Sequence, residues 1–386
     1  MPIKRTSART AFRVEWCSAP ALADIAEEWR ALAQRAIEPN AFYEPAFMLA
    51  ALPVFGTTVR AGLVRTAAGR LAGLFPVDVI RLRGSLRPVL AGWTHPYAPL
   101  GTPLVEREDA VAIIAAWLDH LRRDRTVPRK MLLPLLPERG DFATALDIAL
   151  ARSARRNDSF GHHQRALLDP GAERAGYLQR SIPASRRKEL RRLRRRLEES
   201  APVAFVSATG SDDIANALSA FLALEAQGWK GRAGTAIAAD AALETFVRRA
   251  VAGLAADGQA RVDRLVQDGR TLAATVTLAS GDRAWCWKIA YDESIARASP
   301  GVQLICDLTE DLTAAPEPAQ VDSCATANHP MIDHIWRERL ALCDRLIAVR
   351  PSMVPFSITC RIERLRRAME NRARAARHRL RRRAKR

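Results

Sequence analysis

The sequence lacks several features that would assign it to common protein classes. It contains no apolar run of about 18 residues, which a membrane-spanning helix needs. Residues 1–16 are basic but have no apolar core of the kind found in a secretory signal, so we expect a cytoplasmic protein. The six cysteines are scattered without a CxxC pair, which argues against a zinc site or a disulfide framework. Neither GxGxxG nor GxxxxGK[ST] occurs, so a Rossmann fingerprint and a Walker loop are absent.

Acidic residues are also scarce relative to basic ones, with 42 against 60, and the formal net charge is +18. This charge is concentrated in two segments: residues 186–199 carry a net +5 and residues 361–386 carry a net +11. The rest of the chain is almost neutral. An attraction to nucleic acid, anionic lipid or an acidic substrate is therefore local to these two segments.

The pattern of apolar residues predicts an α+β fold with mixed, largely antiparallel sheets and helices on both faces. In the first half we expect a strand, two helices, a hairpin at 59–66 and 71–80, and then alternating helices and strands to residue 168. The second half repeats this order. Its strands are expected at 203–207, 260–267, 271–279, 284–291, 320–325 and 345–349, and its helices at 211–226, 240–256, 300–313 and 330–343.

Four regions follow from this reading: an N-terminal domain at 1–170, a basic linker helix at 171–200, a second domain at 201–352 and a tail at 353–386. Residues 185–199 place leucines on one face of a helix and arginines elsewhere, which fits either a solvated linker or a phosphate-facing helix. In the tail, apolar residues recur at spacings of three and four on a strongly basic helix. Two interpretations of this tail remain: a disordered extension, or a helix that binds a membrane surface or a partner.

The second half is organised around residues 285–304. Trp285, Trp287, Ile289 and Tyr291 alternate with smaller or polar residues, which predicts a strand with these four on one face and Lys288 on the other. After a loop, Ser299 stands at the expected N-cap of a helix, with Pro300 at its first position. Gly301 allows close approach of a ligand to free backbone N–H groups, and Arg297 adds a positive charge. An anion such as pyrophosphate would suit this turn, whereas the alternative is an ordinary capped helix.

These residues, together with 225–235 (EAQGWKGRAGT) and 321–336 (VDSCATANHPMIDHIW), resemble the GNAT acyltransferase superfamily. More narrowly they resemble the CelD/BcsL-type acetyltransferases, which are associated with cellulose biosynthesis. The resemblance covers about 177–345. The first half looks like a degenerate copy of the same fold, as in the two-domain Fem-type transferases. Two tandem GNAT-like domains followed by a basic C-terminal helix are therefore expected.

The resemblance implies acetyl-CoA or another acyl-CoA as cosubstrate, bound in a gap between the central strand and its neighbour. The pantetheine arm would lie along Trp287 and Ile289, and the pyrophosphate on the turn that contains Arg297, Ser299, Gly301 and Val302. The usual turn is Arg/Gln-x-x-Gly-x-Gly/Ala, and here Pro300 and Val302 replace its two small residues. The loop at 225–235 would shape the acceptor site. Its members Glu225, Trp229 and Lys230, together with Lys288, are therefore assigned to substrate binding.

In this superfamily an amine attacks the thioester directly, so a base, an oxyanion donor and a proton for the thiolate are required. Asp322 is the first candidate for the base or its orienting group, His329 the second, and Tyr291 a candidate proton donor. Each has a structural alternative: an ion pair with an arginine for Asp322, a helix cap for His329, and sheet packing for Tyr291. The spacing of His329, Asp333 and His334 lacks the pattern of a helical zinc site, and we expect no metal.

The leading hypothesis is an acyl-CoA-dependent N-acyltransferase, most simply an acetyltransferase, acting on an amine of a sugar, glycan precursor or lipid-linked molecule. The alternatives are O-acetylation of a polysaccharide, transfer from an aminoacyl-tRNA as in Fem-like proteins, and a non-catalytic protein that binds nucleic acid or an anionic surface. For partners we expect a small-molecule or glycan acceptor and peripheral contact of residues 355–386 with an anionic membrane. Nucleic acid ranks below these, because no base-reading motif is present.

Overall fold

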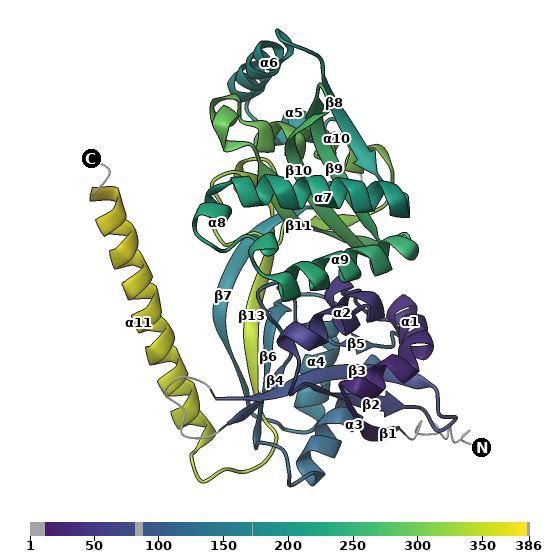
Figure 1. Cartoon of the computed structure of the whole chain (residues 1–386). Helices are drawn as coiled ribbons and strands as arrows, with labels where there is room; N and C mark the ends of the chain where they lie inside the picture. The colour runs from purple at the N-terminus through teal and green to yellow at the C-terminus, as the bar shows by residue number, and fades with distance from the viewer. Residues whose placement is uncertain (1–11, 82–87, 172, 384–386) are drawn as a thin grey trace, which may run out of the picture. The chain divides into compact units, whose positions relative to one another are not determined.

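The fold is described from a computed structural model of the chain that covers residues 12–81, 88–171 and 173–383 (Figure 1). No helix in these ranges combines the length and the apolar character needed to cross a membrane. The chain divides into two compact units that interleave along the sequence. Unit 1 comprises residues 1–38, 58–163 and 342–386, and unit 2 comprises residues 39–57 and 164–341.

Unit 1 is a sheet with helices on both faces. Its strand order is β1-β2-β3-β4-β6-β13-β7, with β5 paired to β3. The strands are β1 (Arg13–Ser18), β2 (Arg60–Arg65), β3 (Leu71–Ile80), β4 (Val89–Gly92), β5 (Leu104–Val105), β6 (Lys130–Pro137), β7 (Asn157–Leu168) and β13 (Glu338–Ala348). The α-helices are α1 (Ala26–Arg35), α3 (Ala110–Arg123), α4 (Asp141–Arg152) and α11 (Phe356–Arg383). Most strand pairs are antiparallel, and β4 with β6 is parallel.

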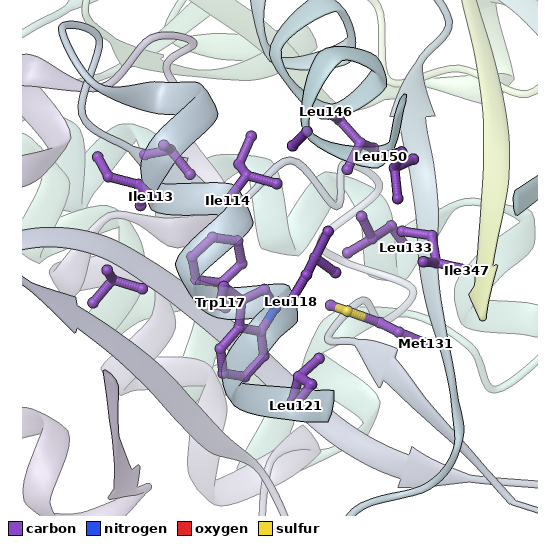
Figure 2. Close-up of a cluster of buried hydrophobic side chains, with 14 of the residues drawn as sticks. Ile113, Ile114, Trp117, Leu118, Leu121, Met131, Leu133, Leu146, Leu150 and Ile347 are labelled. Atoms are coloured by element: carbon purple, nitrogen blue, oxygen red, sulfur yellow. The ribbon is translucent and has the colours of Figure 1, made fainter. Parts of the chain in front are cut away.

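The core of unit 1 lies between the sheet and helices α3 and α4. On α3, Ile113, Ile114, Trp117, Leu118 and Leu121 recur at helical spacing and are buried (Figure 2). They pack against α4 and against alternate residues of the strands, including Met131 and Leu133 of β6. The spacing of apolar residues in the sequence predicts this arrangement, in which the apolar face of a helix packs on the apolar face of a sheet.

The sheet strands of unit 2 have the order β7-β12-β11-β10-β9-β8, in which β12 pairs with Leu167 and Leu168 at the end of β7. Its further strands are β8 (Val203–Ala208), β9 (Ala260–Gln267), β10 (Arg270–Ser280), β11 (Arg283–Tyr291) and β12 (Gln320–Asp322). Its α-helices are α2 (Pro45–Phe55), α5 (Tyr177–Ser181), α6 (Ala184–Glu198), α7 (Ser211–Gln227), α8 (Trp229–Arg232), α9 (Ala241–Ala256) and α10 (Pro300–Ala314). Strands β8 to β11 are antiparallel, whereas β11 pairs with β12 in parallel.

Helices cover both faces of this sheet as well. Helices α2, α7 and α9 lie on one face, where Phe47 and Phe246 make edge-to-face ring contacts with Trp287. Helices α5 and α10 lie on the other face, where Ile305 and Leu308 pack with residues of β11 and β12. The predicted α+β class, with mixed sheets, helices on both faces and a C-terminal helix, is confirmed.

Three expectations about elements differ from the structure. The helix predicted at 330–343 is a short 3₁₀ turn at Ile332–His334 followed by strand β13, because residues from Leu342 onward pair with β6 and alternate between its two faces. Strand β12 stops at Asp322 instead of 325. The segment 171–200 is not a separate linker, because α5 and α6 are packed into unit 2, and residues 39–57 also belong there.

Candidate functional site

The candidate site is a gap between two parallel strands of unit 2. Strand β11 runs to Tyr291, but β12 pairs with it only from Arg283 to Trp285. Beyond Trp285, no other strand in the described part of the chain pairs with this edge of β11. The edge therefore presents backbone N–H and C=O groups that an extended ligand with amide groups can pair with.

A β-bulge in β11 sets the direction of the side chains at this gap. Cys286 lies opposite Thr277 and Lys288 opposite Val276, so Trp287 is an extra residue in the ladder. An extra residue breaks the period-two alternation, so the faces predicted from the sequence change after Trp287.

The bulge corrects the predicted faces of the strand. Trp285 and Trp287 do share a face, where Trp285 contacts Phe42 in the turn before α2 and Trp287 contacts α2 and α9. Ile289 instead packs with Leu304 and Ile305 of α10, and Tyr291 lies against Gly301 of that helix. Lys288, predicted to lie opposite Trp287, has its ammonium 5.5 Å from the Trp287 ring centroid. The bulge thus brings Tyr291 to the start of α10 and Lys288 to the α7–α8 side.

A cavity of about 590 Å³ occupies the gap. Its walls come from β11, from the start of α10, from the loop after β12 and from α8. Ten of the residues predicted for the site line it: Trp229, Lys230, Trp287, Lys288, Ile289, Tyr291, Ser299, Gly301, Val302 and His329. Glu225, Arg297 and Asp322 do not line it. The remaining walls include Cys286, Cys324, Ala325 and Met331, which sequence reasoning did not select because single small or apolar residues carry no distinctive pattern.

Helix α10 begins at the edge of this cavity. Pro300 occupies its first position as predicted, and the N–H groups of Gly301 and Val302 follow, in the turn where a helix leaves such donors without internal partners. Ser299 does not act as the predicted side-chain cap; its backbone is left-handed, with φ 54°, and its side chain makes no capping hydrogen bond. Arg297 lies exposed one turn earlier, outside the cavity wall. A Cβ added at Gly301 would lie 3.2 Å from the Tyr291 ring, so this position is closely packed.

Lys288 is a cationic group of the cavity whose pKa is strongly lowered. Burial, and after it the nearby positive charge of Lys230, lower its pKa from 10.5 to about 8 against the opposing effect of Glu225. Lys230 is held by Glu225, with 2.5 Å between Nζ and Oε1. Glu225 also accepts the N–H of Ile237 at 2.9 Å and is buried. Glu225 is therefore placed as a support for Lys230 behind the cavity wall.

Trp229 stands at the mouth of the cavity with 59% of its surface exposed. Its backbone N–H donates to Glu293 at 2.7 Å, and Glu293 also accepts a hydrogen bond from Arg232. The short helix α8 is thus tied to the turn before α10. An exposed aromatic ring on a tethered loop is suited to contact with an acceptor molecule.

Asp322, the first candidate for the catalytic base, is buried beneath the site. Its carboxylate forms an ion pair with Arg165 of β7, and both side chains are about 95% or more shielded from solvent. Its second oxygen accepts the N–H of Cys324 at 2.9 Å. This geometry matches the structural alternative, and it fits a role in holding the loop that begins at Cys324, itself at φ 51°.

His329 lines the cavity and is half-buried. Its Nδ1 lies 3.3 Å from the N–H of Met331 and 3.4 Å from that of Ile332, so Nδ1 accepts and the ring proton belongs on Nε2. Burial lowers the pKa of His329. A neutral imidazole in this tautomer offers a proton donor to the cavity, which favours stabilisation of an oxyanion or thiolate over general-base catalysis.

The two cysteines of the cavity are unsuited to act as nucleophiles. Burial raises the pKa of Cys286 to about 11, and burial together with Asp322 raises that of Cys324 well above its usual value. The thiolate is the reactive form of cysteine, and it is disfavoured at both positions. Direct transfer from donor to acceptor is therefore better supported than a cysteine-bound intermediate.

The basic helix α6 packs beside the site. Leu190 and Leu193 are buried, and Arg194 pairs with Asp307 of α10 at 3.1 Å. Other cations on α6, including Arg191, Arg195 and Arg196, are exposed or partly exposed. Because α6 contacts the turn that precedes α10, these charges add to the positive potential near the first N–H groups of that helix.

Residues 184–327 match the protein family described as "Acetyltransferase (GNAT) domain". The match spans α6 to the loop after β12 and so includes most of the cavity. Unit 2 therefore contains a GNAT acetyltransferase domain, and the predicted acyltransferase class is confirmed at this level. No significant match occurs among curated protein sequences.

Solved structures share the fold over most of the chain. The structure of FemX matches with a TM-score of 0.57 and 9% identity, covering 84% of this chain and 96% of its own. A conserved protein of unknown function from Bacteroides thetaiotaomicron VPI-5482 matches with a TM-score of 0.53 and 10% identity, covering 85% and 97%. Both likenesses show the fold alone. A tandem GNAT protein from the clavulanic acid biosynthesis pathway matches with a TM-score of 0.43 and 16% identity, covering 88% and 100%.

Proposed function

We propose that unit 2 transfers an acyl group, most simply acetyl, from coenzyme A to an amine. The observation that carries this proposal is the gap between β11 and β12, which ends at the start of α10 inside the GNAT-matching region. The unpaired edge of β11 would pair with the amide groups of the pantetheine arm. The N–H groups of Gly301 and Val302 would hold the pyrophosphate, with Arg297 and α6 supplying positive charge.

In the reaction the acceptor nitrogen attacks the thioester carbonyl carbon, the C–S bond breaks, and the nitrogen loses a proton. Lys288, which the sequence assigned to substrate binding, would take this proton, because a pKa of about 8 leaves a useful fraction of the side chain neutral near physiological pH. His329, with its proton on Nε2, would donate a hydrogen bond to the developing oxyanion or to the departing thiolate without losing this proton. Tyr291 is a second proton donor in the same wall.

The acceptor would approach from the side of Trp229 and Lys230. An exposed indole beside a lysine suits a sugar ring or another polar molecule that carries a negative group. An amine of a sugar, a glycan precursor or a lipid-linked molecule is therefore the acceptor class we propose, in keeping with the resemblance to CelD/BcsL-type acetyltransferases. A cytoplasmic location is part of the same proposal.

Calorimetric titration of acetyl-CoA into the full chain tests the donor. We expect binding to the wild type and its loss in Gly301→Glu, because the carboxylate would stand where the pyrophosphate is placed and the added side chain meets the Tyr291 ring. Gly301→Gln separates charge from bulk. Gly210→Glu is a matched control, since Gly210 lies in unit 2 outside the cavity, has φ −78°, and its nearest neighbour would be 3.6 Å from an added Cβ.

Circular dichroism and the melting temperature establish that each variant is folded. Loss of binding in Gly301→Glu with retention in Gly210→Glu supports the site. Absence of wild-type binding to acetyl-CoA and to longer acyl-CoAs refutes the proposed donor. An aminoacyl-tRNA donor would then be the next one to test.

A further inference from the structure

Helix α11 of unit 1 exposes an apolar stripe. Ile358, Ile362, Leu365 and Met369 follow at spacings of four, three and four, and each has 41–63% of its surface exposed. The opposite face of the helix holds it to the sheet, where Thr359, Cys360 and Glu363 are buried. The apolar stripe that the sequence indicates is therefore outside the core of its own unit.

Ion pairs fix this orientation of the helix. Arg364 pairs with Asp158 of β7, and Arg367 pairs with Asp344 of β13 at 2.5 Å. Glu363 lies between Arg366 and Arg367 on the inner side. Rotation of α11 to bury the stripe against this sheet would break these pairs and bury charged groups. The outward direction of the stripe is thus set by the packing of unit 1.

A positively charged hollow of about 340 Å³ lies at the foot of α11. Four of its lining residues are cations, Arg125, Arg129, Lys130 and Arg350, and none is acidic. Val89, another lining residue, packs in the same cluster as Cys360 and Phe356 of α11. Met353, three residues before the helix, is 85% exposed at the rim, and Val79 is also exposed there.

Lys130 gives this hollow the character of an anion site. Only 6% of its surface is exposed, and its ammonium forms no hydrogen bond or ion pair with any residue in the described ranges, although its backbone pairs with Ala348 in the sheet. Arg350 is also buried. Burial is the main reason that its pKa is lowered, and the nearby charges of Arg125 and Arg129 lower it as well. The Arg350 guanidinium donates to the backbone carbonyls of Asp124 and Val127, whereas the Lys130 ammonium has no such partner. Buried cations are normally paired, so an anionic ligand would stabilise the ammonium of Lys130.

We propose that this face of unit 1 docks onto an anionic phospholipid bilayer. The stripe of α11 would enter the interface, and a lipid phosphate would occupy the hollow. Apolar side chains flanked by exposed arginines are the composition of an interfacial helix, and residues 361–386 hold thirteen Lys and Arg against two Glu. A second copy of the chain would bring two such basic helices together, and a nucleic acid would leave the stripe without a contact. The proposal is independent of acyl transfer.

Vesicle sedimentation with the full chain tests the proposal. We expect binding to vesicles of phosphatidylcholine with one quarter phosphatidylglycerol, and at least tenfold weaker binding to phosphatidylcholine alone. Leu365→Ser/Met369→Ser should weaken binding to the mixed vesicles at least tenfold at unchanged net charge. Ile148→Ser/Val206→Ser is the matched control, because both residues are exposed on other elements.

The hollow is tested by Arg125→Gln/Lys130→Met against Arg122→Gln/Arg123→Gln. Both pairs remove two positive charges, but only the first alters the wall of the hollow. Each charge near an anionic surface contributes about fivefold to binding, so equal losses would indicate a non-specific effect and refute the phosphate site. Calorimetry with inorganic phosphate and glycerol 3-phosphate separates the two sources of phosphate.

Three results would overturn the proposal. The first is equal binding to both vesicle types or to neither. The second is unchanged vesicle binding by Leu365→Ser/Met369→Ser, since this would leave only the charge of the tail. The third is tight binding of soluble phosphate or of RNA together with no vesicle binding, which would assign the basic surface to those ligands.

Discussion

Replacement of Lys288 by Met should raise the free energy of unfolding at neutral pH, and this gain over the wild type should become smaller as the pH rises. The folded-state pKa of Lys288 is about 8, whereas its usual value is 10.5. Between these two values the unfolded state binds more protons than the folded state. The free energy of unfolding contributed by this group therefore rises as the pH rises through that window, and it is least favourable below pH 8.

The size of the effect follows from the shift. Each pKa unit corresponds to about 1.36 kcal/mol, so the charged lysine destabilises the folded state by at most about 3 kcal/mol at neutral pH. From pH 7 to pH 9 this penalty falls by about 1.3 kcal/mol. Lys288→Met removes the titrating group, so the difference in unfolding free energy between variant and wild type should shrink by that amount over the same range.

Urea titration with hydrogen-exchange detection in peptides from β10 and β11 measures this difference locally. At a slope of about 2 kcal/mol per M of urea, the predicted change is about 0.6 M in midpoint difference. Lys188→Met on α6 is the control, because it makes the same replacement at an exposed position outside the cavity. A difference for Lys288→Met that is flat from pH 7 to 9, or that grows with pH, would refute the lowered pKa and with it the proposed role in proton transfer.

Three further changes test the packing around the sites. Arg165→Met should lower the stability of unit 2 by about 3–5 kcal/mol in urea unfolding, because Asp322 is left buried and unpaired. The double variant Arg165→Met/Asp322→Leu should recover most of this loss. Absence of recovery would contradict a purely structural ion pair. His329→Ala should cost about 1 kcal/mol through the lost backbone contacts, and His329→Asn should cost less, as judged by thermal unfolding. Gly62→Ala should destabilise unit 1 by about 1–3 kcal/mol, since its Cβ would lie 2.1 Å from the Trp117 ring. The double variant Gly62→Ala/Trp117→Leu should lose less stability than the sum of the losses in the two single variants, as measured by urea unfolding.

The sequence by itself determined the α+β class and most of the elements. Helices α3 and α9 and strands β9 and β10 follow from apolar spacing and from the Asp268-Gly269 turn, because the period of burial is a local property of helix and strand geometry. The position of Pro300 at the start of α10 also follows from a local residue preference. The predicted cavity residues of β11 and the start of α10 lie together because a strand that runs into a helix places them near one another. Trp229, Lys230 and His329 come from other elements, and the tertiary structure brings them to the same cavity.

The tertiary structure decided which face and which partner each side chain meets. The bulge at Trp287 arises from the pairing of β11 with β10, so the reversal that brings Tyr291 to Gly301 had no signal in the residue pattern. Residues 338–348 form a strand because β6 and β7 stand beside them, although their spacing also fits a helix. Asp322 meets Arg165 across more than 150 residues of sequence. The outward direction of the α11 stripe likewise depends on distant ion pairs, because a periodic pattern identifies an apolar face but not what covers it.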